Sequence, residues 1–351
     1  MITVVLRDMQ WRVKRLAGGA LATALVFTMT LLLGALHDSF LDETTRTVEL
    51  FGGDQWVVTT GVAGPFTTNS PMTTDLEGRV LATPGVHDVS AVAIFRHVVT
   101  GAAATGVTDV NVIGYEVGST VKPPVLTGRM PAAGGEVAAD ESLDVPIGRV
   151  LTLAGHPLRV VGIVRGVTYN GGTPTVLIAL EEAQGVAFDG RRLASALIVT
   201  GTATSLPTDL TGMTPLQVRD DLRRPLLVAT RSLGLLSALL WIVAAGIVGF
   251  TCYLSGLDRA HDVAVLKAIG VGTWRLALGL LAMGVVIALA AAAIAIVLAL
   301  ALVPTFPMSI DISASSCLVL LALALMTGSV ASIAGMVHDV RTDPTVALSR
   351  A

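Results

Sequence analysis

LAGGALATALVFTMTLLLGAL, residues 16–36, decides the fold, because this stretch contains no charged side chain and is long enough to cross a membrane. A transmembrane helix needs about 20 mostly apolar residues to cross about 30 Å of hydrocarbon. Three further uncharged runs meet that condition, at residues 232–252, 276–310 and 312–337. Lipid offers the backbone no hydrogen-bond partner, so each run must be helical. The sequence predicts a membrane protein with four transmembrane α-helices.

The third run is too long for one helix perpendicular to the membrane. Pro304 and Pro307 interrupt helical hydrogen bonding, so this helix should end near Val303. The predicted spans are residues 16–36, 231–252, 276–303 and 312–337, with a short external loop at residues 304–311.

A cleaved signal peptide is the alternative interpretation of the first run. Its apolar part is longer than the usual stretch of about 7–15 residues, and no small-x-small cleavage site follows Leu36. We therefore expect this helix to be retained.

Composition supports a membrane protein. Hydrophobic residues make up 53% of the 351 residues and charged residues only 14%, whereas about 25% is usual in soluble domains. The net charge of −3 is too small to indicate a nucleic-acid partner. No Asp, Glu, Lys or Arg lies in the apolar runs after residue 231, which argues against an ion or proton pathway. Small residues at Gly18-Gly19, Gly246 and Ala288–Ala295 would let the helices pack closely.

The basic residues predict the orientation, because cytoplasmic loops are enriched in Lys and Arg. Short segments carry them at the N-terminus, between the second and third spans and in the tail: Arg7, Arg12, Lys14, Arg15, Arg259, Lys267, Arg275, Arg341 and Arg350. The short loop at residues 304–311 has none. We expect residues 1–15, 253–275 and 338–351 in the cytoplasm of a bacterium, with residues 37–230 outside its cytoplasmic membrane.

Residues 37–230 should form one large outer domain of mixed α/β structure. Both cysteines, Cys252 and Cys317, lie in apolar runs, so disulfides cannot hold this domain together. Alternating β-branched runs predict strands at residues 55–60, 89–94, 110–115, 150–153, 158–164, 175–180 and 196–200. Short helices are predicted at residues 75–82, 180–187 and 217–224.

The outer domain shows no catalytic or metal-binding motif. His87, His97 and His156 have no partner at a recognisable spacing, so surface or core histidines are the favoured interpretation. Arg223, Arg224 and Arg231 lie just before the second span. They suit either lipid headgroups or pairing with Asp220 and Asp221, and the sequence does not distinguish these.

The predicted cytoplasmic loop contains LDRAHDVAVLKAIGVGTW, residues 257–274. Its acidic residues come first and Lys267 comes late, which suits the dipole of a short amphipathic helix that Gly270 and Gly272 terminate. Such a helix either merely connects two spans or docks in a groove of a soluble partner. The residues that would contact that partner are Asp258, Arg259, His261, Asp262, Val263, Leu266, Lys267, Ile269 and Gly270.

Residues 258–270 resemble the cytoplasmic motif (E/D)-R-x-x-(E/D)-(I/V)-A-V-L-K-A-(I/L)-G of the FtsX-like, or MacB-type, permeases of ABC transporters, the mechanotransmission class. The tail at residues 343–348 is similar to that family's D-P-x-x-A-L ending. Gly128-Arg129-Met130-Pro131, followed by Gly135-Glu136-Val137, is similar to its G-R-x-P … G-E-V stretch. Similarity continues through Ile147-Gly148, residues 158–164 and residues 175–184.

One span, an outer domain and then three spans is also the family's topology, so the resemblance covers nearly the whole chain. Ala260 and His261 replace basic residues that flank the arginine in many members. That departure leaves open which residue pairs with the partner.

A Walker A site requires Gly-Lys-Ser/Thr, and none of the lysines, Lys14, Lys122 and Lys267, follows a glycine. The chain therefore has no catalytic residues and no cofactor or metal of its own. The resemblance implies a separate ABC ATPase subunit that binds ATP and Mg²⁺, beneath a permease homodimer in a two-plus-two complex.

The resemblance further implies export or extrusion of a substrate driven by movement of the outer domain. One alternative is a mechanotransmitting regulator of an outer partner such as a cell-wall hydrolase, without transport. A second alternative is a membrane-anchored binding protein with no ATPase.

Overall fold

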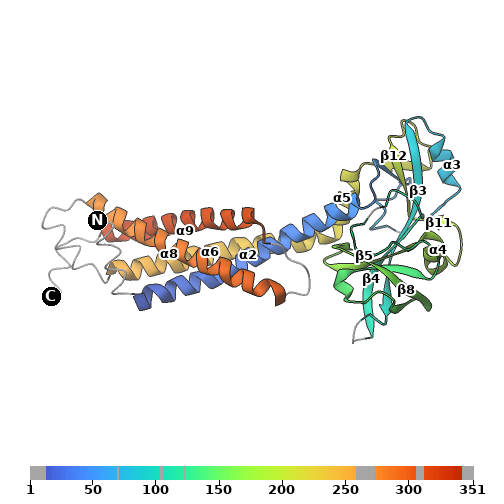
Figure 1. The fold of residues 1–351 in the computed structure, drawn as a ribbon. Coiled ribbons are helices and arrows are strands. Elements are labelled where there is room, and N and C mark those ends of the chain that lie inside the picture. The colour runs from blue at the N-terminus through green and yellow to red at the C-terminus, as the bar shows by residue number, and fades with distance from the viewer. Residues whose placement is uncertain are drawn as a thin grey trace. The chain divides into compact units, whose positions relative to one another are not determined.

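The computed structural model describes residues 13–68, 71–102, 106–121, 123–257, 273–305 and 312–341 (Figure 1). The chain forms two compact units. One comprises residues 1–38 and 230–351 and is called the membrane unit. The other comprises residues 39–229 and is called the outer domain.

The described residues of the membrane unit are helical except for residues 312–313. Its helices are α2 (Val13–Glu49), α6 (Leu227–Leu257), α8 (Thr273–Leu302) and α9 (Ala314–Arg341). Within the described residues, α2, α6 and α8 contain stretches long and apolar enough to cross a membrane, and α9 has a shorter apolar stretch at Ala314–Val330. A 3-10 turn, η3 (Val303–Thr305), follows α8, which confirms the end predicted from Pro304.

Alanines allow the helices of this unit to approach closely. Ala288, Ala291, Ala292 and Ala295 of α8 are fully buried, as the small-residue pattern predicted. A Cβ placed on Gly328 of α9 would lie 2.8 Å from the carbonyl oxygen of Gly284. Gly19, another of the predicted small residues, lies so close to Thr251 of α6 that a Cβ there would be 2.6 Å from its hydroxyl oxygen. A contact between larger side chains, which the small-residue pattern does not reveal, joins Phe27 to Trp241, whose ring centroids lie 5.3 Å apart.

Helix α2 continues well past the end of its apolar run at Leu36. Its last residues belong to the outer domain and bury one face at intervals of three and four residues, formed by Glu43, Thr44, Thr47 and Val48. Three of these side chains are polar, so hydropathy alone did not reveal the extension.

The outer domain is a mixed sheet in the order β13-β1-β12-β3-β4-β10-β6-β8-β5, with β7 paired to β3 and β8. The pairs β4–β10 and β6–β8 are parallel, and the other pairs are antiparallel. The strands are β1 (Gln55–Thr59), β3 (Val86–Thr100), β4 (Val107–Tyr115), β5 (Val125–Gly128), β6 (Glu136–Asp140), β7 (Val150–Leu153), β8 (His156–Val164), β9 (Thr168–Tyr169), β10 (Thr173–Ala179), β12 (Ala196–Gly201) and β13 (Leu210–Met213), and β2 (Met72–Thr73) pairs separately with β11 (Leu193–Ala194).

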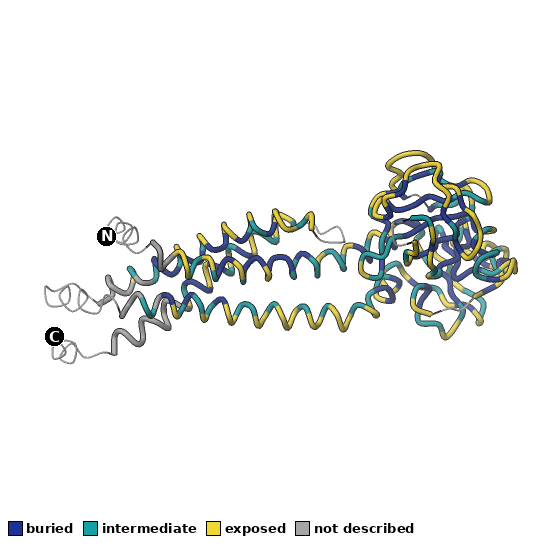
Figure 2. The backbone as a smooth tube through the Cα atoms, turned by 90° about the horizontal axis from the view of Figure 1, so that it is seen from below, coloured by how far each residue is buried: buried dark blue, intermediate teal, exposed yellow. Residues whose placement is uncertain are grey.

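Short helices complete the outer domain: α3 (Leu76–Leu81), α4 (Leu180–Phe188) and α5 (Pro215–Arg223), with 3-10 turns η1 (Glu141–Leu143) and η2 (Arg224–Leu226). Figure 2 shows buried residues through the interior of the outer domain, and most of the residues of this core lie in the strands. The core is built around large side chains with no exposure, among them Trp56, Ile113, Leu151, Leu177 and Leu197.

Every predicted strand and helix of the outer domain is present, with shifted ends. The largest difference is at β3 and β4, which continue as a long hairpin. Sequence patterns did not predict β5, β6 and β13, nor the two-residue strands β2, β9 and β11. Strand β5 is exposed along its whole length, and β6 carries an acid at each end, so neither has the apolar alternation that predicts a strand.

Candidate functional site: the coupling loop and the outer-domain motif

The predicted coupling residues, Asp258, Arg259, His261, Asp262, Val263, Leu266, Lys267, Ile269 and Gly270, lie outside the described residues. The structure describes the helices on both sides of them. Helix α6 ends at Leu257 and α8 begins at Thr273. The loop's position between two membrane helices is therefore clear, and its contacts remain a prediction.

The Gly-Arg-x-Pro … Gly-Glu-Val stretch closes a turn between β5 and β6. The Arg129 guanidinium forms a two-pronged ion pair with Glu136, with Nη1 donating to Oε2 at 2.7 Å and Nη2 donating to Oε1. The amide of Ala132 donates to the same carboxylate at 3.0 Å. Such paired geometry is more specific than a single charge contact, so these motif residues shape the turn.

Two glycines allow β5 to approach β8 closely at this turn. Gly128 has a φ of +81°, a conformation that L side chains rarely adopt. A Cβ on Gly162 of β8 would overlap the carbonyl group of Arg129. Tyr115 then donates a hydrogen bond of 2.6 Å to the carbonyl of Pro131, which fixes the far side of the turn.

The motif extends to α4 through Glu182. Its Oε2 accepts a 2.9 Å hydrogen bond from the amide of Gly135, and its Oε1 lies 3.1 Å from Nδ1 of His156. His156 thus has a carboxylate partner that sequence spacing did not reveal. Its exposed, structural setting agrees with the non-catalytic interpretation.

The ion pair with Arg129, followed by the hydrogen bond from Ala132, lowers the pKa of Glu136 to about 2. The stability that this carboxylate contributes is present above its ordinary pKa of 4.5 and is lost as pH falls toward 2. We expect Glu136→Gln to lower the melting temperature at pH 7, with a smaller difference from wild type in acid. Arg129→Lys should lower it too, because lysine cannot make the two-pronged contact.

Thermal unfolding of the purified protein at several pH values tests this expectation. Glu181→Gln is the matched control, because Glu181 is exposed on the neighbouring helix α4. Equal melting temperatures for wild type and Glu136→Gln at pH 7 would contradict it.

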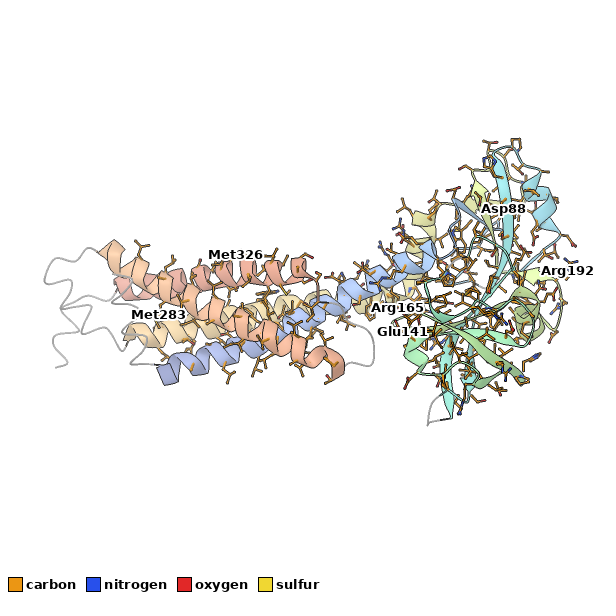
Figure 3. The ribbon with its side chains drawn as sticks, viewed as in Figure 1. Asp88, Glu141, Arg165, Arg192, Met283 and Met326 are labelled. Carbon is orange, nitrogen blue, oxygen red and sulfur yellow. The ribbon has the colours of Figure 1, made fainter. Side chains whose placement is uncertain are left out.

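A second acidic feature pairs Glu77 of α3 with Glu116, which follows β4. Burial, and then the nearby charge of Glu116, raise the pKa of Glu77 to about 7. Burial likewise raises the pKa of Glu116, whose carboxylate accepts a hydrogen bond from Ala91. Arg192 partly offsets both shifts, and Figure 3 shows it in the outer domain.

Raised carboxyl pKa values make the outer domain less stable as pH rises. Protonated Glu77 contributes stability that is fully present below pH 4.5 and is lost as pH rises through about 7. We expect the melting temperature to fall across this window and Glu77→Gln to flatten the fall. A profile that is unchanged in Glu77→Gln would contradict the assignment.

Two buried carboxylates, on α2 and on α5, accept hydrogen bonds from backbone amides near the first and last residues of the outer domain. Glu43 of α2 accepts hydrogen bonds from the amides of Gly171 at 3.1 Å and Gly172 at 2.8 Å. Burial raises the pKa of Glu43, and those hydrogen bonds partly offset the effect. Asp221 of α5 is fully buried and accepts hydrogen bonds from the amides of Phe66 at 3.1 Å and Thr67 at 3.3 Å.

These contacts settle part of the question raised by the arginine cluster. Arg223 lies 4.0 Å from Asp220 and donates a 3.4 Å hydrogen bond to Thr44 of α2. Asp221 binds backbone amides instead of an arginine. Arg223 therefore lies within ion-pair distance of Asp220, whereas Asp221 is held by backbone amides. The alternative of lipid headgroups stays open for Arg224 and Arg231.

No group of three or more His, Cys, Asp or Glu side chains suited to a metal ion occurs among the described residues.

Comparison with known proteins identifies the family. Residues 234–343 match the model for the FtsX-like permease C-terminal region. Two proteins of Mycobacterium tuberculosis strain H37Rv, both described as uncharacterized ABC transporter permeases, are 37% identical to this chain over 347 residues, 99% of each length.

Solved structures resemble the outer domain only distantly. The periplasmic region of MacB from Actinobacillus actinomycetemcomitans is 10% identical, with a TM-score of 0.37, and covers 50% of this chain and 96% of its own. The extracellular domain of the transporter YknZ from Gram-positive bacteria is 14% identical, with a TM-score of 0.34, and covers 42% of this chain and 83% of its own.

Identity of 37% along essentially the full length carries the assignment, and the family match covers the helices after the outer domain. The protein is a multi-pass membrane protein with a large mixed α/β domain after its first helix, and it belongs to the FtsX-like family of ABC transporter permeases.

Proposed function

We propose that this permease couples ATP hydrolysis on a separate ATPase subunit to movement of its extracytoplasmic domain, and that this movement exports or extrudes a substrate. The observation that carries the proposal is the continuity of α2. This helix runs without interruption from Val13 to Glu49, and its last residues are part of the outer domain. In this proposal, an axial displacement at the inner end of the helix is carried along its backbone hydrogen bonds to its last residues.

The energy source must lie in another subunit, because no lysine of this chain sits in a Gly-Lys-Ser/Thr sequence. ATP and Mg²⁺ would bind that ATPase. The amphipathic segment at residues 258–270 would dock on it, with Asp262 and Lys267 as charged contacts and Val263 and Leu266 as apolar ones. The termini would lie on the same cytoplasmic side as this segment, in a bacterial cytoplasmic membrane.

We further propose that two copies of this permease form a homodimer that binds two ATPase subunits. Helix α6 has a face available for the second copy, because several of its large apolar side chains are at least half exposed in a single copy, among them Leu235, Leu239, Ile242 and Phe250. Inside hydrocarbon this face meets either lipid or a second copy, and neither costs an unpaired polar group.

Detergent pull-down of the tagged full-length protein tests the proposed function. The expected result is a co-purifying ATPase chain whose hydrolysis is stimulated by the transported substrate. Capture of a cell-wall hydrolase without substrate flux would favour the regulatory alternative. Purification with no nucleotide-binding chain under several mild detergents would contradict both and leave the membrane-anchored binding protein.

A further inference from the structure

The two chain segments that join the outer domain to membrane helices meet at one buried cluster, which we call the carboxylate junction. It consists of Glu43 and Thr44 on α2, Asp221 and Arg223 on α5, and two loop segments at residues 66–67 and 169–172. All of these residues lie within residues 39–229, the outer domain.

On the α2 side, the Glu43 carboxylate sits against a turn whose backbone is shaped to receive it. Asn170, Gly171 and Gly172 have φ values of 59°, 77° and 83°. Consecutive amides of this turn point at the two carboxylate oxygens, one amide to each oxygen. Thr47 adds a 3.2 Å hydrogen bond to the carbonyl of Thr168 just before the turn.

On the α5 side, the Asp221 carboxylate binds the loop that follows β1. Both amides and the Thr67 hydroxyl donate to it. The chain passes close enough at Gly64 that a Cβ there would overlap the carboxylate. Asp221 therefore fixes α5 to the loop after β1, whereas Glu43 binds the turn between β9 and β10.

Two further contacts close these interactions into a ring. The Phe66 ring packs edge-on against Tyr169 with centroids 5.4 Å apart, which joins the Asp221 loop to the Glu43 turn. Arg223 donates to Thr44, which joins α5 to α2 directly. Glu43, Thr44 and Asp221 are 6%, 1% and 0% exposed, so water does not replace these partners.

We propose that the carboxylate junction locks α2 and α5 to one another and to the sheet, so that displacement of the membrane helices moves the outer domain as one rigid body. Sliding α2 by one helical turn, about 5.4 Å, would break both Glu43 hydrogen bonds. Glu43 and Asp221 are then positioning residues for the proposed mechanical coupling, and this inference rests on the proposed function.

The variants Glu43→Gln and Asp221→Asn test the junction with little change in size. In Glu43→Gln an amino group replaces one carboxylate oxygen, so one of the two glycine amides faces a donor and loses its acceptor. In Asp221→Asn the remaining oxygen can still accept the amides of Phe66 and Thr67, so this variant removes the charge and changes only the contact with the Thr67 hydroxyl. Asp42→Asn is the matched control, because Asp42 neighbours Glu43 on α2 and is exposed. Glu43→Gln removes a buried charge whose pKa burial raises, so it should fold even if Asp221→Asn does not.

Two measurements on the permease–ATPase complex decide the question. Hydrogen–deuterium exchange should be faster by several-fold at Gly171 and Gly172 in Glu43→Gln and unchanged in Asp42→Asn. With spin labels on the outer domain, at Val117→Cys in a background lacking Cys252 and Cys317, the ATP-dependent change in distance between copies should fall by half or more. ATP hydrolysis should stay within about twofold of wild type.

The possible results distinguish a failure of this inference from a failure of the proposed function. If wild type shows the ATP-dependent change and Glu43→Gln shows it undiminished, the junction does not couple and the inference is wrong while the function stands. Unchanged exchange at Gly171 and Gly172 would overturn it too. If wild type hydrolyses ATP with no change in distance, the proposed function fails and the inference fails with it.

Discussion

Reversing both charges of the predicted coupling segment, Asp262→Lys with Lys267→Glu, should abolish binding of the ATPase subunit. Both residues match the charged positions of the family motif within residues 258–270. Losing one partner of a buried interfacial charge pair costs about 2–5 kcal/mol. Affinity should therefore fall by at least about thirtyfold.

Pull-down of the tagged variant, with quantification of the ATPase chain, measures this loss. Reversal of an exposed outer-domain charge, Glu181→Lys, is the control and should leave binding intact. Compensating reversals on the ATPase surface should restore binding if the contact is electrostatic. Wild-type amounts of ATPase on the doubly reversed permease would remove this segment from the interface.

Breaking α2 at the boundary between the units, with Ser39→Pro, should leave the ATPase bound but uncouple it from the outer domain. Ser39 is the first residue of the outer domain and lies inside the continuous helix. Proline there removes one helical hydrogen bond and clashes with the preceding turn, at a cost of about 3 kcal/mol or more. The kink interrupts the stiff connection on which the proposed function depends.

Substrate flux, or ATP-dependent movement of the outer domain, should fall at least about tenfold in Ser39→Pro, because the kink bends the helix that carries the movement in the proposed function. ATP hydrolysis should persist. Ser39→Ala preserves the helix and should behave like wild type. Coupled activity that survives Ser39→Pro in a properly inserted protein would show that α2 does not carry the movement.

Much of the architecture was predictable because hydropathy and charge act over whole segments. The absence of charge in residues 16–36 and the basic residues around the other runs predict the helices and an orientation without any knowledge of packing. The end of α8 before Pro304 was predictable for the same kind of local reason, since proline cannot continue a helix.

The junction was not predictable, because its chemistry depends on residues far apart in the chain. Glu43 and Gly172 are separated by most of the outer domain, and the carboxylate's role depends on backbone amides that have no sequence signature. The extension of α2 was hidden for a related reason: its buried face contains threonines and a glutamate whose partners appear only after folding.

The outer-domain motif lies between these cases. Its spacing signalled that Gly128-Arg129 and Gly135-Glu136 belong together. Only the structure shows that the arginine and the glutamate form an ion pair across the turn, and that Gly162 leaves room for β5. The spacing predicted that these residues act together, and the ion pair between Arg129 and Glu136 is the physical reason.

The most direct test of mechanical coupling is the distance between the outer domains of two copies, measured by pulsed electron paramagnetic resonance with labels at Val117→Cys. Val117 is exposed in the outer domain, far in sequence from the coupling segment. In the wild-type permease–ATPase complex, trapping ATP should shift the distance distribution relative to the nucleotide-free complex. An identical distribution in both states, while the complex hydrolyses ATP, would contradict the account.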